Sequence, residues 1–309
     1  MLNRLRNVGF IGAATLGLLA AISTQASAEV LNDFTIKPSA FGGPVAPVAG
    51  DDTIVNCPNG GPALGCIVAD KIIGNYVEVF TVVTPQVGNT AGTFSVDVAF
   101  SAAQFLGNDG TNPITAGQTG LTNDYQIYAL FSAGGQFLCG ATQCIFTVDN
   151  TPGQSILQVW EDDANVVQDT TLTPPAVSTN PGVINFTRGG NTANDNLLAT
   201  SSVLVGGGNQ LTPPCDLQSN AGQPCGSFTI VFRPFNLTVA GQTFFVSPDP
   251  FYITLALSGQ FNSFDLVTTQ TVNGSADAVF AGQAVPEPAT LSLLGLGLVG
   301  LARRRMRKK

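Results

Sequence analysis

Phe94-Ser-Val-Asp-Val-Ala-Phe-Ser101 decides the fold, because apolar residues occupy every second position along it. Successive side chains of a β-strand point to opposite faces of a sheet, so this period of two predicts a strand with one apolar face. The residues expected on the inward face are Phe94, Val96, Val98 and Phe100. Those expected on the outward face are Ser95, Asp97 and Ser101.

The same period of two continues on either side of this stretch. It recurs in Tyr125–Phe131 and Phe228–Arg233. In a third segment it places four apolar side chains on one face: Phe251, Ile253, Leu255 and Leu257. Runs rich in β-branched residues are found at Ile72–Thr84, Ile145–Asp149, Ile156–Trp160 and Leu198–Val205. Glycine, proline, asparagine and aspartate separate the runs, as turns require.

These segments predict an all-β fold, because no part of residues 29–283 carries the pattern of an amphipathic helix. Short strands separated by turns are typical of an antiparallel sandwich or jelly-roll-like domain. Residues 173–182 are rich in proline. We interpret them as a long loop within one domain of residues 29–283, the alternative being a boundary between two subdomains.

Charge is unevenly distributed along the chain. Only 10% of the residues are charged, and between Glu29 and Ala284 nineteen acidic residues stand against four basic ones. An acidic body of this kind repels phosphate backbones, so we expect no nucleic-acid partner. The same charge favours solubility and the recruitment of cations.

Six cysteines lie in three local pairs: Cys57 and Cys66, Cys139 and Cys144, and Cys215 and Cys225. Sequence alone does not select among the connectivities that six cysteines allow. Local pairing is favoured, because short loops are the easiest to close and the periplasm is oxidising. A thiolate metal site is disfavoured, because no pair has the Cys-x-x-Cys spacing and the chain contains no histidine.

Residues 1–28 have the features of a secretory signal peptide that signal peptidase removes. Arg4 and Arg6 precede a mostly apolar run, and the small residues around Ser27 provide a cleavage site after Ala28. A permanent membrane anchor would need about twenty apolar residues and no such cleavage site. We therefore expect an exported protein whose mature chain begins at Glu29.

Residues 284–309 have three ordered parts. The motif Pro286, Glu287, Pro288 is followed by an apolar stretch, Ala289–Ala302, and then by a basic tail that begins with Arg303, Arg304 and Arg305. At ~1.5 Å per residue, a helix over the apolar stretch would span ~21 Å of a hydrocarbon core about 30 Å thick. The basic tail should stay on the cytoplasmic side. The expected contact with the inner membrane, through this C-terminal helix, is therefore transient.

This three-part arrangement resembles the PEP-CTERM sorting signal of Gram-negative bacteria. The resemblance implies that exosortase, a membrane protease, cleaves near the Pro-Glu-Pro motif and removes the apolar stretch and the basic tail. It also implies that the product resides at the cell surface or in the extracellular matrix, within the exopolysaccharide layer.

Segments of the body resemble the flocculation-associated PEP-CTERM proteins. The segments are Asp70–Val79, Phe244–Tyr252, Phe261–Phe264 and Asn273–Phe280. The resemblance implies a role in holding cells and exopolysaccharide together as flocs. It supplies no catalytic residues.

A catalytic role is not expected. Without histidine the chain cannot build Ser-His-Asp or Cys-His machinery. A carboxylate pair such as Glu78 and Glu161 is the glycosidase alternative, but Glu78 lies in mid-strand between two valines, where an outward, solvated carboxylate is the simpler interpretation. We expect a non-catalytic protein that needs no cofactor, and a glycan-acting enzyme is the less favoured alternative.

Trp160 and the carboxylates that follow it are the remaining candidates for a binding site. A carbohydrate-binding module would stack a sugar on an aromatic face, and Trp160 is the candidate platform, although a core position is the interpretation we favour. Glu161, Asp162 and Asp163 are hard oxygen ligands that suit Ca²⁺. Their spacing differs from that of an EF-hand loop, so we favour a solvated acidic turn and expect no metal site.

We predict three local disulfides, Cys57–Cys66, Cys139–Cys144 and Cys215–Cys225, each of which stabilises a short loop modestly. Peptide mapping under non-reducing conditions should recover three cystine-linked peptides with these partners. The reduced and alkylated protein is the control. A crossed pattern, or free thiols at all six positions, would refute the pairing.

Overall fold

The computed structural model describes residues 31–43, 54–57, 65–85, 91–140, 143–163, 169–211, 226–261 and 268–283. The chain divides into two units after Val30, and every described residue belongs to the second unit, Leu31–Lys309. The expected cleavage site at Ala28 and the sorting segment 284–309 lie outside the described residues. The predicted domain boundaries therefore stay predictions.

Strands dominate the described residues, which confirms the expected all-β fold. The strands are β1 (Phe34–Ile36), β2 (Ile54–Asn56), β3 (Gly65–Ala69), β4 (Lys71–Thr84), β5 (Gly92–Gly107), β6 (Asn112–Ile114), β7 (Gln126–Cys139), β8 (Gln143–Val148), β9 (Ser155–Asp162), β10 (Thr170–Thr173), β11 (Thr187–Gly190), β12 (Asp195–Ser201), β13 (Leu204–Leu211), β14 (Gly226–Phe232), β15 (Asn236–Leu237), β16 (Phe245–Ser247), β17 (Tyr252–Phe261) and β18 (Thr269–Gln283). The helical elements are the 3-10 helix η1 (Pro38–Phe41), α1 (Ala116–Thr119) and α2 (Val239–Phe244). None of the helices found in these residues has the length and apolar character needed to cross a membrane.

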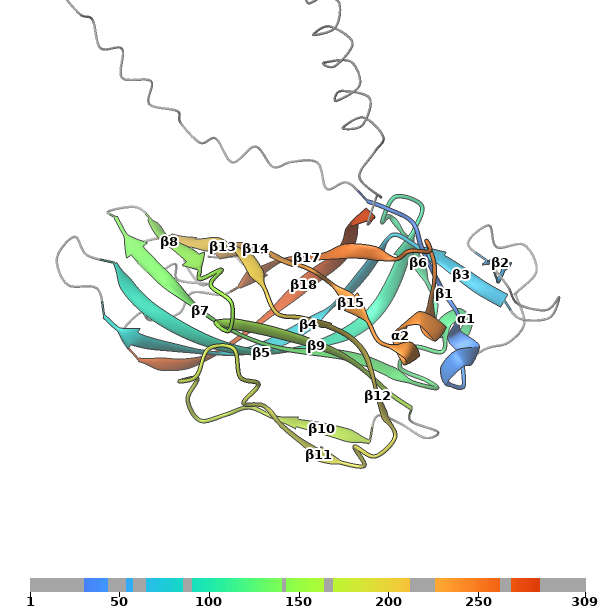
Figure 1. The fold of residues 1–309 in the computed structure, drawn as a ribbon, viewed down its shortest axis with the longest axis horizontal. Helices are drawn as coiled ribbons and strands as arrows, with labels where there is room; N and C mark the ends of the chain where they lie inside the picture. The colour runs from blue at the N-terminus through green and yellow to red at the C-terminus, as the bar shows by residue number, and fades with distance from the viewer. Residues whose placement is uncertain are drawn as a thin grey trace, which may run out of the picture. The chain divides into compact units, whose positions relative to one another are not determined.

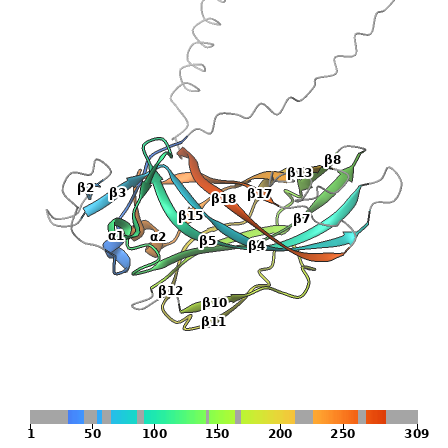
Figure 2. The same cartoon turned by 180° about the vertical axis from the view of Figure 1, so that it is seen from behind.

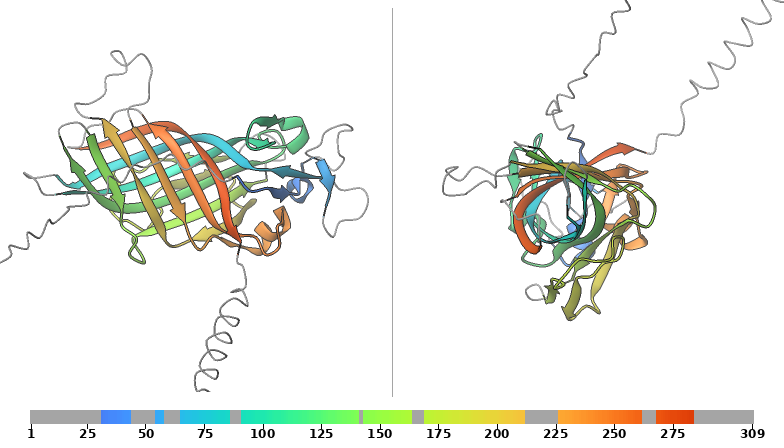
Figure 3. Two further views of the ribbon diagram at one scale, coloured as in Figure 1. Left: turned by 90° about the horizontal axis from the view of Figure 1, so that it is seen from above. Right: turned by 90° about the vertical axis from the view of Figure 1, so that its left-hand side faces the viewer.

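One antiparallel sheet of twelve strands closes on itself, because β7 pairs with β5 on one side and with β8 and β9 on the other. The closed ring runs through β4, β5, β7, β8, β13, β14, β17 and β18, as the end-on view in Figure 3 shows. Figure 2 shows β5, β4 and β18 side by side in this ring. Strands β9, β12 and β15 extend the sheet beyond the ring. The antiparallel pairing is as expected; twelve strands form one barrel-like sheet where we had expected a sandwich or jelly roll. The other strands form a sheet of four in the order β16-β1-β3-β2 and the pair β10-β11.

The register gives the ring a continuous apolar inner face. The four β5 residues expected on the inward face are buried in one cluster with the inner side chains of the neighbouring strands: Phe94, Val96, Val98 and Phe100. In β17, Leu255 and Leu257 are buried, but Ile253 is 40% exposed. Phe251, which precedes the strand, packs against the core. The regular register of β17 with β18 keeps Ile253 on the face of Leu255 and Leu257, as predicted, although its side chain is not covered.

Glycines stand opposite aromatic residues across the strands of the ring. The cross-strand pairs are Gly92 with Phe137, Gly135 with Phe94, Gly226 with Phe261, Gly259 with Phe228 and Gly274 with Tyr76. A Cβ atom at Gly259 would lie 2.7 Å from the Phe228 ring, and one at Gly135 would lie 2.5 Å from the Phe94 ring. Eight strands enclose a space just wide enough for side chains to fill. Each aromatic ring therefore uses the volume that its partner leaves empty.

The outward face of β5 is buried beneath residues 174–186, which we call the covering segment. The hydroxyl oxygens of Ser95 and Ser178 lie 2.8 Å apart. The backbone N–H and the side-chain amide of Asn185 donate to the Asp97 carboxylate at 3.2 and 2.9 Å. Ser95 and Asp97 point outward as predicted, but both are 0% exposed. The covering segment contains most of the predicted loop 173–182, and it joins β10 to β11 (Figure 1).

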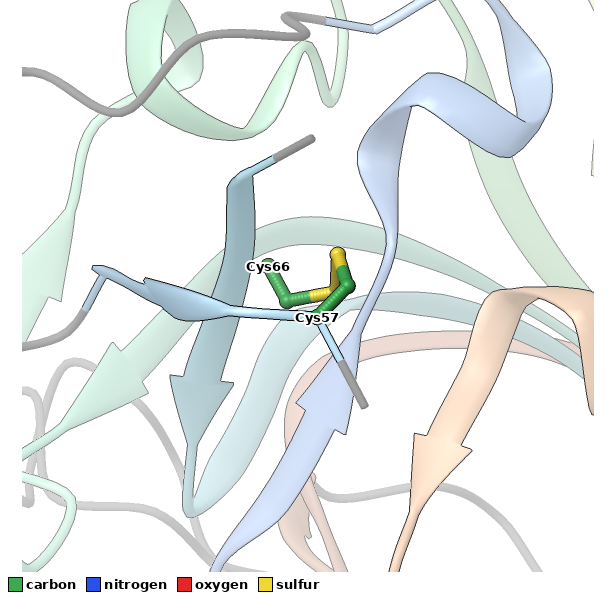
Figure 4. The surroundings of a disulfide bond; sticks show 2 residues. All are labelled: Cys57 and Cys66. Carbon is green, nitrogen blue, oxygen red and sulfur yellow. A yellow bond between two sulfur atoms is a disulfide. The ribbon is translucent and has the colours of Figure 1, made fainter. Parts of the chain in front are cut away.

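Two of the predicted disulfides are confirmed. Cys57 and Cys66 link the residue after β2 to β3 with an S–S distance of 1.99 Å (Figure 4). Cys139 and Cys144 form a cross-strand pair of β7 and β8, with an S–S distance of 1.96 Å. The third predicted pair, Cys215 and Cys225, lies outside the described residues.

The glycine–aromatic pairing predicts the effect of one added methyl group. Gly259→Ala should lower the free energy of unfolding by about 1–3 kcal/mol, because the new Cβ would collide with the Phe228 side chain and overpack the interior of the strand ring. Gly117→Ala is the matched control, since nothing lies within 4 Å of a Cβ at that position. Denaturant unfolding of both variants and the parent protein measures the difference. Equal stabilities for Gly259→Ala and Gly117→Ala would contradict the packing argument.

Candidate functional site

Trp160, Glu161 and Asp162 are the last three residues of β9, so their side chains alternate between the two faces of the sheet. Asp162 lies on the same face as Trp160 and opposite Asp195 of β12, whereas Glu161 lies on the other face, opposite Asn196. Glu161 and Asp162 are each 0% exposed. The interpretation of a solvated acidic turn was therefore wrong for these two residues, because β9 continues through them between β7 and β12.

Trp160 is half-buried and its ring is in use within the protein. It packs against a small outer cluster that contains Tyr128 and Phe186. The Arg188 guanidinium carbon lies 3.8 Å from the centre of the Trp160 ring, in a cation–π contact. The indole N–H donates to the side-chain oxygen of Gln158 at 3.3 Å. The guanidinium covers one face of the indole, and that face does not offer a free platform to a sugar.

Asp195 connects the hairpin of β10 and β11 to the main sheet. Its carboxylate accepts hydrogen bonds from Tyr128 Oη at 2.6 Å, from Thr170 Oγ1 at 2.8 Å and from Arg188 at 3.0 Å. The Asp195 side chain is 0% exposed and that of Arg188 is 27% exposed. A buried carboxylate with three donors is well satisfied. Because Thr170 and Arg188 belong to the hairpin, this network fixes the hairpin's position over β7 and β12.

Asp162 and Asp169 form a second acidic contact close to this network. Burial is the main reason that the pKa of Asp162 is raised to about 6; the Thr170 amide opposes the shift and the neighbouring Asp169 carboxyl adds to it. Thr170 N–H donates to Asp162 at 3.0 Å, and the Asn191 amide donates to Asp169 at 3.1 Å. Two adjoining carboxyls favour the protonation of one of them.

The triplet Glu161, Asp162, Asp163 does not form a joint calcium site. Glu161 and Asp162 point to opposite faces of the sheet, so a single ion could not be held by both. Across the described ranges, no group of three or more His, Cys, Asp or Glu side chains is placed to hold a metal ion.

Glu161 is a buried carboxyl with one hydrogen-bond donor. The Asn196 side-chain amide donates to its Oε2 at 2.9 Å, while Oε1 has no partner among the described residues. Burial raises the pKa of Glu161 to about 8; the Asn196 amide opposes the shift, and the carboxylates of Asp163, Asp162 and Asp195 add to it. At neutral pH the folded protein therefore holds Glu161 mainly in its protonated form.

Glu78 faces the interior of the ring and is half-buried. In β4 it shares the inner face with Tyr76 and Phe80, and these three residues line a cavity of ≈ 80 Å³. Burial raises the pKa of Glu78 to about 7. The expected outward orientation was wrong. The sequence signal that could have corrected it is the position of Glu78 between two aromatic residues, each two positions away.

Glu78 and Glu161 are too far apart to act as a glycosidase pair. Following the register from Glu78 across β5 and β7 leads to Leu157 of β9. Glu161 lies four residues farther along that strand, which is a displacement of ~13 Å at ~3.3 Å per residue. Carboxyl pairs of glycosidases are separated by about 5–9.5 Å.

The residues that organise the Trp160 region were missed in the sequence. Arg188, Tyr128 and Asp195 come from β11, β7 and β12, and only the fold brings them together. One signal was available for Arg188. It is one of just four basic residues between Glu29 and Ala284. With so few cations available, each of them is a candidate partner for a cluster of carboxylates.

Comparison with known proteins identifies the C-terminal segment. Residues 284–308 match the family described as the PEP-CTERM protein-sorting motif. The chain thus carries a PEP-CTERM sorting motif, and this motif implies export, sorting to the cell surface and processing by exosortase. No curated protein and no solved structure matches the chain.

The buried Glu161 predicts a pH dependence of stability with a definite sign. Its pKa is raised from 4.5 to about 8 on folding. The contribution of the protonated carboxyl to the free energy of unfolding is therefore fully present below pH 4.5 and is lost as the pH rises through 8. Glu161→Gln should therefore melt at a higher temperature than the parent at pH 8 and at nearly the same temperature at pH 4.5. Thermal unfolding at a series of pH values measures both.

Asp149→Asn is the control for this experiment. Asp149 is exposed, and its hydrogen bonds with Thr151 lower its pKa, so its loss should not reproduce the alkaline gain. If the melting temperatures of Glu161→Gln and the parent differ by the same amount at pH 4.5 and at pH 8, ionisation of Glu161 does not control the pH dependence of stability.

Proposed function

We propose that the chain is a non-catalytic matrix protein that promotes the aggregation of cells together with exopolysaccharide. The observation that carries the proposal is the PEP-CTERM motif at residues 284–308, because it implies sorting to the cell surface. The proposal adds that the protein meets exopolysaccharide there. The proposal includes a Gram-negative host, removal of residues 1–28 by signal peptidase, and a transient stay in the inner membrane before exosortase cuts.

The segments that resemble flocculation-associated proteins support a shared scaffold. Asp70–Val79 and Asn273–Phe280 lie largely in β4 and β18, and these strands pair with each other in the ring. Gly274 of one segment faces Tyr76 of the other in a glycine–aromatic pair. The resemblance therefore concerns residues that build the ring, and it supports a common fold more directly than a common ligand.

The surface of the body suits many weak contacts with sugars. Serine, threonine, asparagine and glutamine provide hydroxyl and amide groups that exchange hydrogen bonds with glycans directly or through water. The acidic excess between Glu29 and Ala284 opposes direct packing against anionic cell surfaces. Bridging through neutral glycans or through divalent cations such as Ca²⁺ is therefore part of the proposal.

The two alternatives receive less support from the geometry. A carbohydrate-binding module based on Trp160 would have to displace the Arg188 guanidinium from the ring face. In a glycan-acting enzyme based on Glu78 and Glu161, the two carboxyls would have to act on one glycosidic bond, although the strand register places them too far apart.

The proposal predicts that a deletion strain loses flocculation in calcium-containing medium. The parent gene should restore it, and so should a Glu78→Gln, Glu161→Gln double variant, because neither carboxyl performs chemistry. A variant with Pro286, Glu287 and Pro288 changed to alanine should fail to restore it, and intact-mass analysis should show that this variant keeps the C-terminal tail. Sedimentation of the cultures is the measurement.

Normal flocculation of the deletion strain would overturn the matrix role. If the double variant is present at normal abundance and it alone does not restore flocculation, the enzyme alternative is favoured. Loss of flocculation on Trp160→Ala alone, at normal abundance, would favour the carbohydrate-binding module.

A further inference from the structure

The cavity inside the ring contains one carboxylate and otherwise almost only apolar walls. Its lining includes Phe94, Phe131, Phe228 and Phe261 together with Glu78. A smaller cavity of ≈ 30 Å³ adjoins this wall, since Phe131 and Leu257 line both. We propose that the larger cavity binds a small aliphatic ammonium ion, whose charged group pairs with the Glu78 carboxylate.

Glu78 has no partner in the part of the chain that the structure describes. Burial is the only influence on its ionisation, with neither a hydrogen bond nor a neighbouring positive charge to offset it. Glu78 is half-buried, and removing part of a carboxylate from water without a partner is costly, so proteins normally pair or hydrogen-bond such a group. The cation that completes the site should therefore come from outside the chain.

The walls of the cavity select for the sign of the ligand's charge. None of the described basic residues, Lys37, Lys71, Arg188 and Arg233, lines the cavity, so an anionic ligand would meet Glu78 without compensation. Tyr76 is the one other titratable group in the lining, and its pKa is raised by burial and by Glu78, so it stays neutral. A charge-assisted bond from an ammonium group is stronger than a bond from a neutral hydroxyl.

The size of the cavity sets the length of the ligand. An apolar cavity of about 150 Å³ accommodates benzene. A cavity of ≈ 80 Å³ accordingly suits a few heavy atoms beside the carboxylate. n-Butylammonium has a short apolar chain and one charged end, and we choose it as the probe. The phenylalanine side chains would contact the alkyl chain, as in other small-molecule sites with apolar walls and few polar groups.

Titration calorimetry with the purified full-length chain tests the proposal. At pH 8, n-butylammonium should bind saturably, while n-butyrate should not bind and n-butanol should bind at least about tenfold more weakly. Glu78→Gln should weaken n-butylammonium binding at least about tenfold. Glu161→Gln is the matched control, because Glu161 is another strand glutamate with a raised pKa but does not line the cavity. The affinity of this variant for n-butylammonium should equal that of the parent.

The parent protein supplies a second test that needs no substitution. The Glu78 carboxyl has a pKa of about 7, so n-butylammonium binding should weaken by tens of fold between pH 8 and pH 5 as the carboxylate is protonated. Absence of saturable binding at pH 8 would overturn the proposal and leave a cavity filled by water. Equal binding of n-butanol and n-butylammonium, or binding independent of pH, would also overturn it. None of these outcomes bears on flocculation, which the deletion strain tests separately.

Discussion

The fit of aromatic rings against glycines is the constraint on which the rest of the structure depends. A ring of eight strands has room for about one layer of inward side chains, and this chain fills that layer largely with phenylalanine. Two opposed phenylalanines at every level would overfill it, so Phe94 and Phe228 each face a glycine across the strand. A β-strand glycine ordinarily weakens a sheet. Here an aromatic side chain covers it, which restores the lost packing.

The outer face follows a different rule, because its polar residues are buried by the chain itself. Ser95 and Asp97 alternate with the inward aromatics, and the covering segment satisfies them with Ser178 and Asn185. Asp195 performs the same function for the hairpin of β10 and β11. These contacts explain why the sheet needs so few basic residues: backbone amides, hydroxyls and side-chain amides supply most of the donors to its buried carboxylates, and the Arg188 guanidinium joins them at Asp195.

The sequence was sufficient for the two faces of β5 and for the two described disulfides, since a period of two and a short loop are local properties. It was insufficient for ring closure, because the pairing of β7 with β5 depends on contacts between distant residues. It also misplaced Glu78 and Asp162. In both cases a carboxylate was assumed to seek water. The alternation of β4 turns Glu78 inward, and Asp162 is buried where it accepts a hydrogen bond from the N–H of Thr170 in the hairpin. The grouping of Trp160 with Arg188 combines strands far apart in the chain, and no local signal contains it.

Burial of carboxyls changes what the acidic composition means at the surface. Between Glu29 and Ala284 the sequence holds nineteen acidic residues, but Asp97, Glu161 and Asp162 are fully buried. The pKa of Glu161 is raised to about 8, so this carboxyl carries little charge at neutral pH. In the proposed role as a matrix protein, multivalent cations would therefore meet the exposed carboxylates in turns and loops, such as Asp109 and Asp149. Such isolated sites bind cations weakly, which suits reversible cross-linking of many molecules better than tight binding by one.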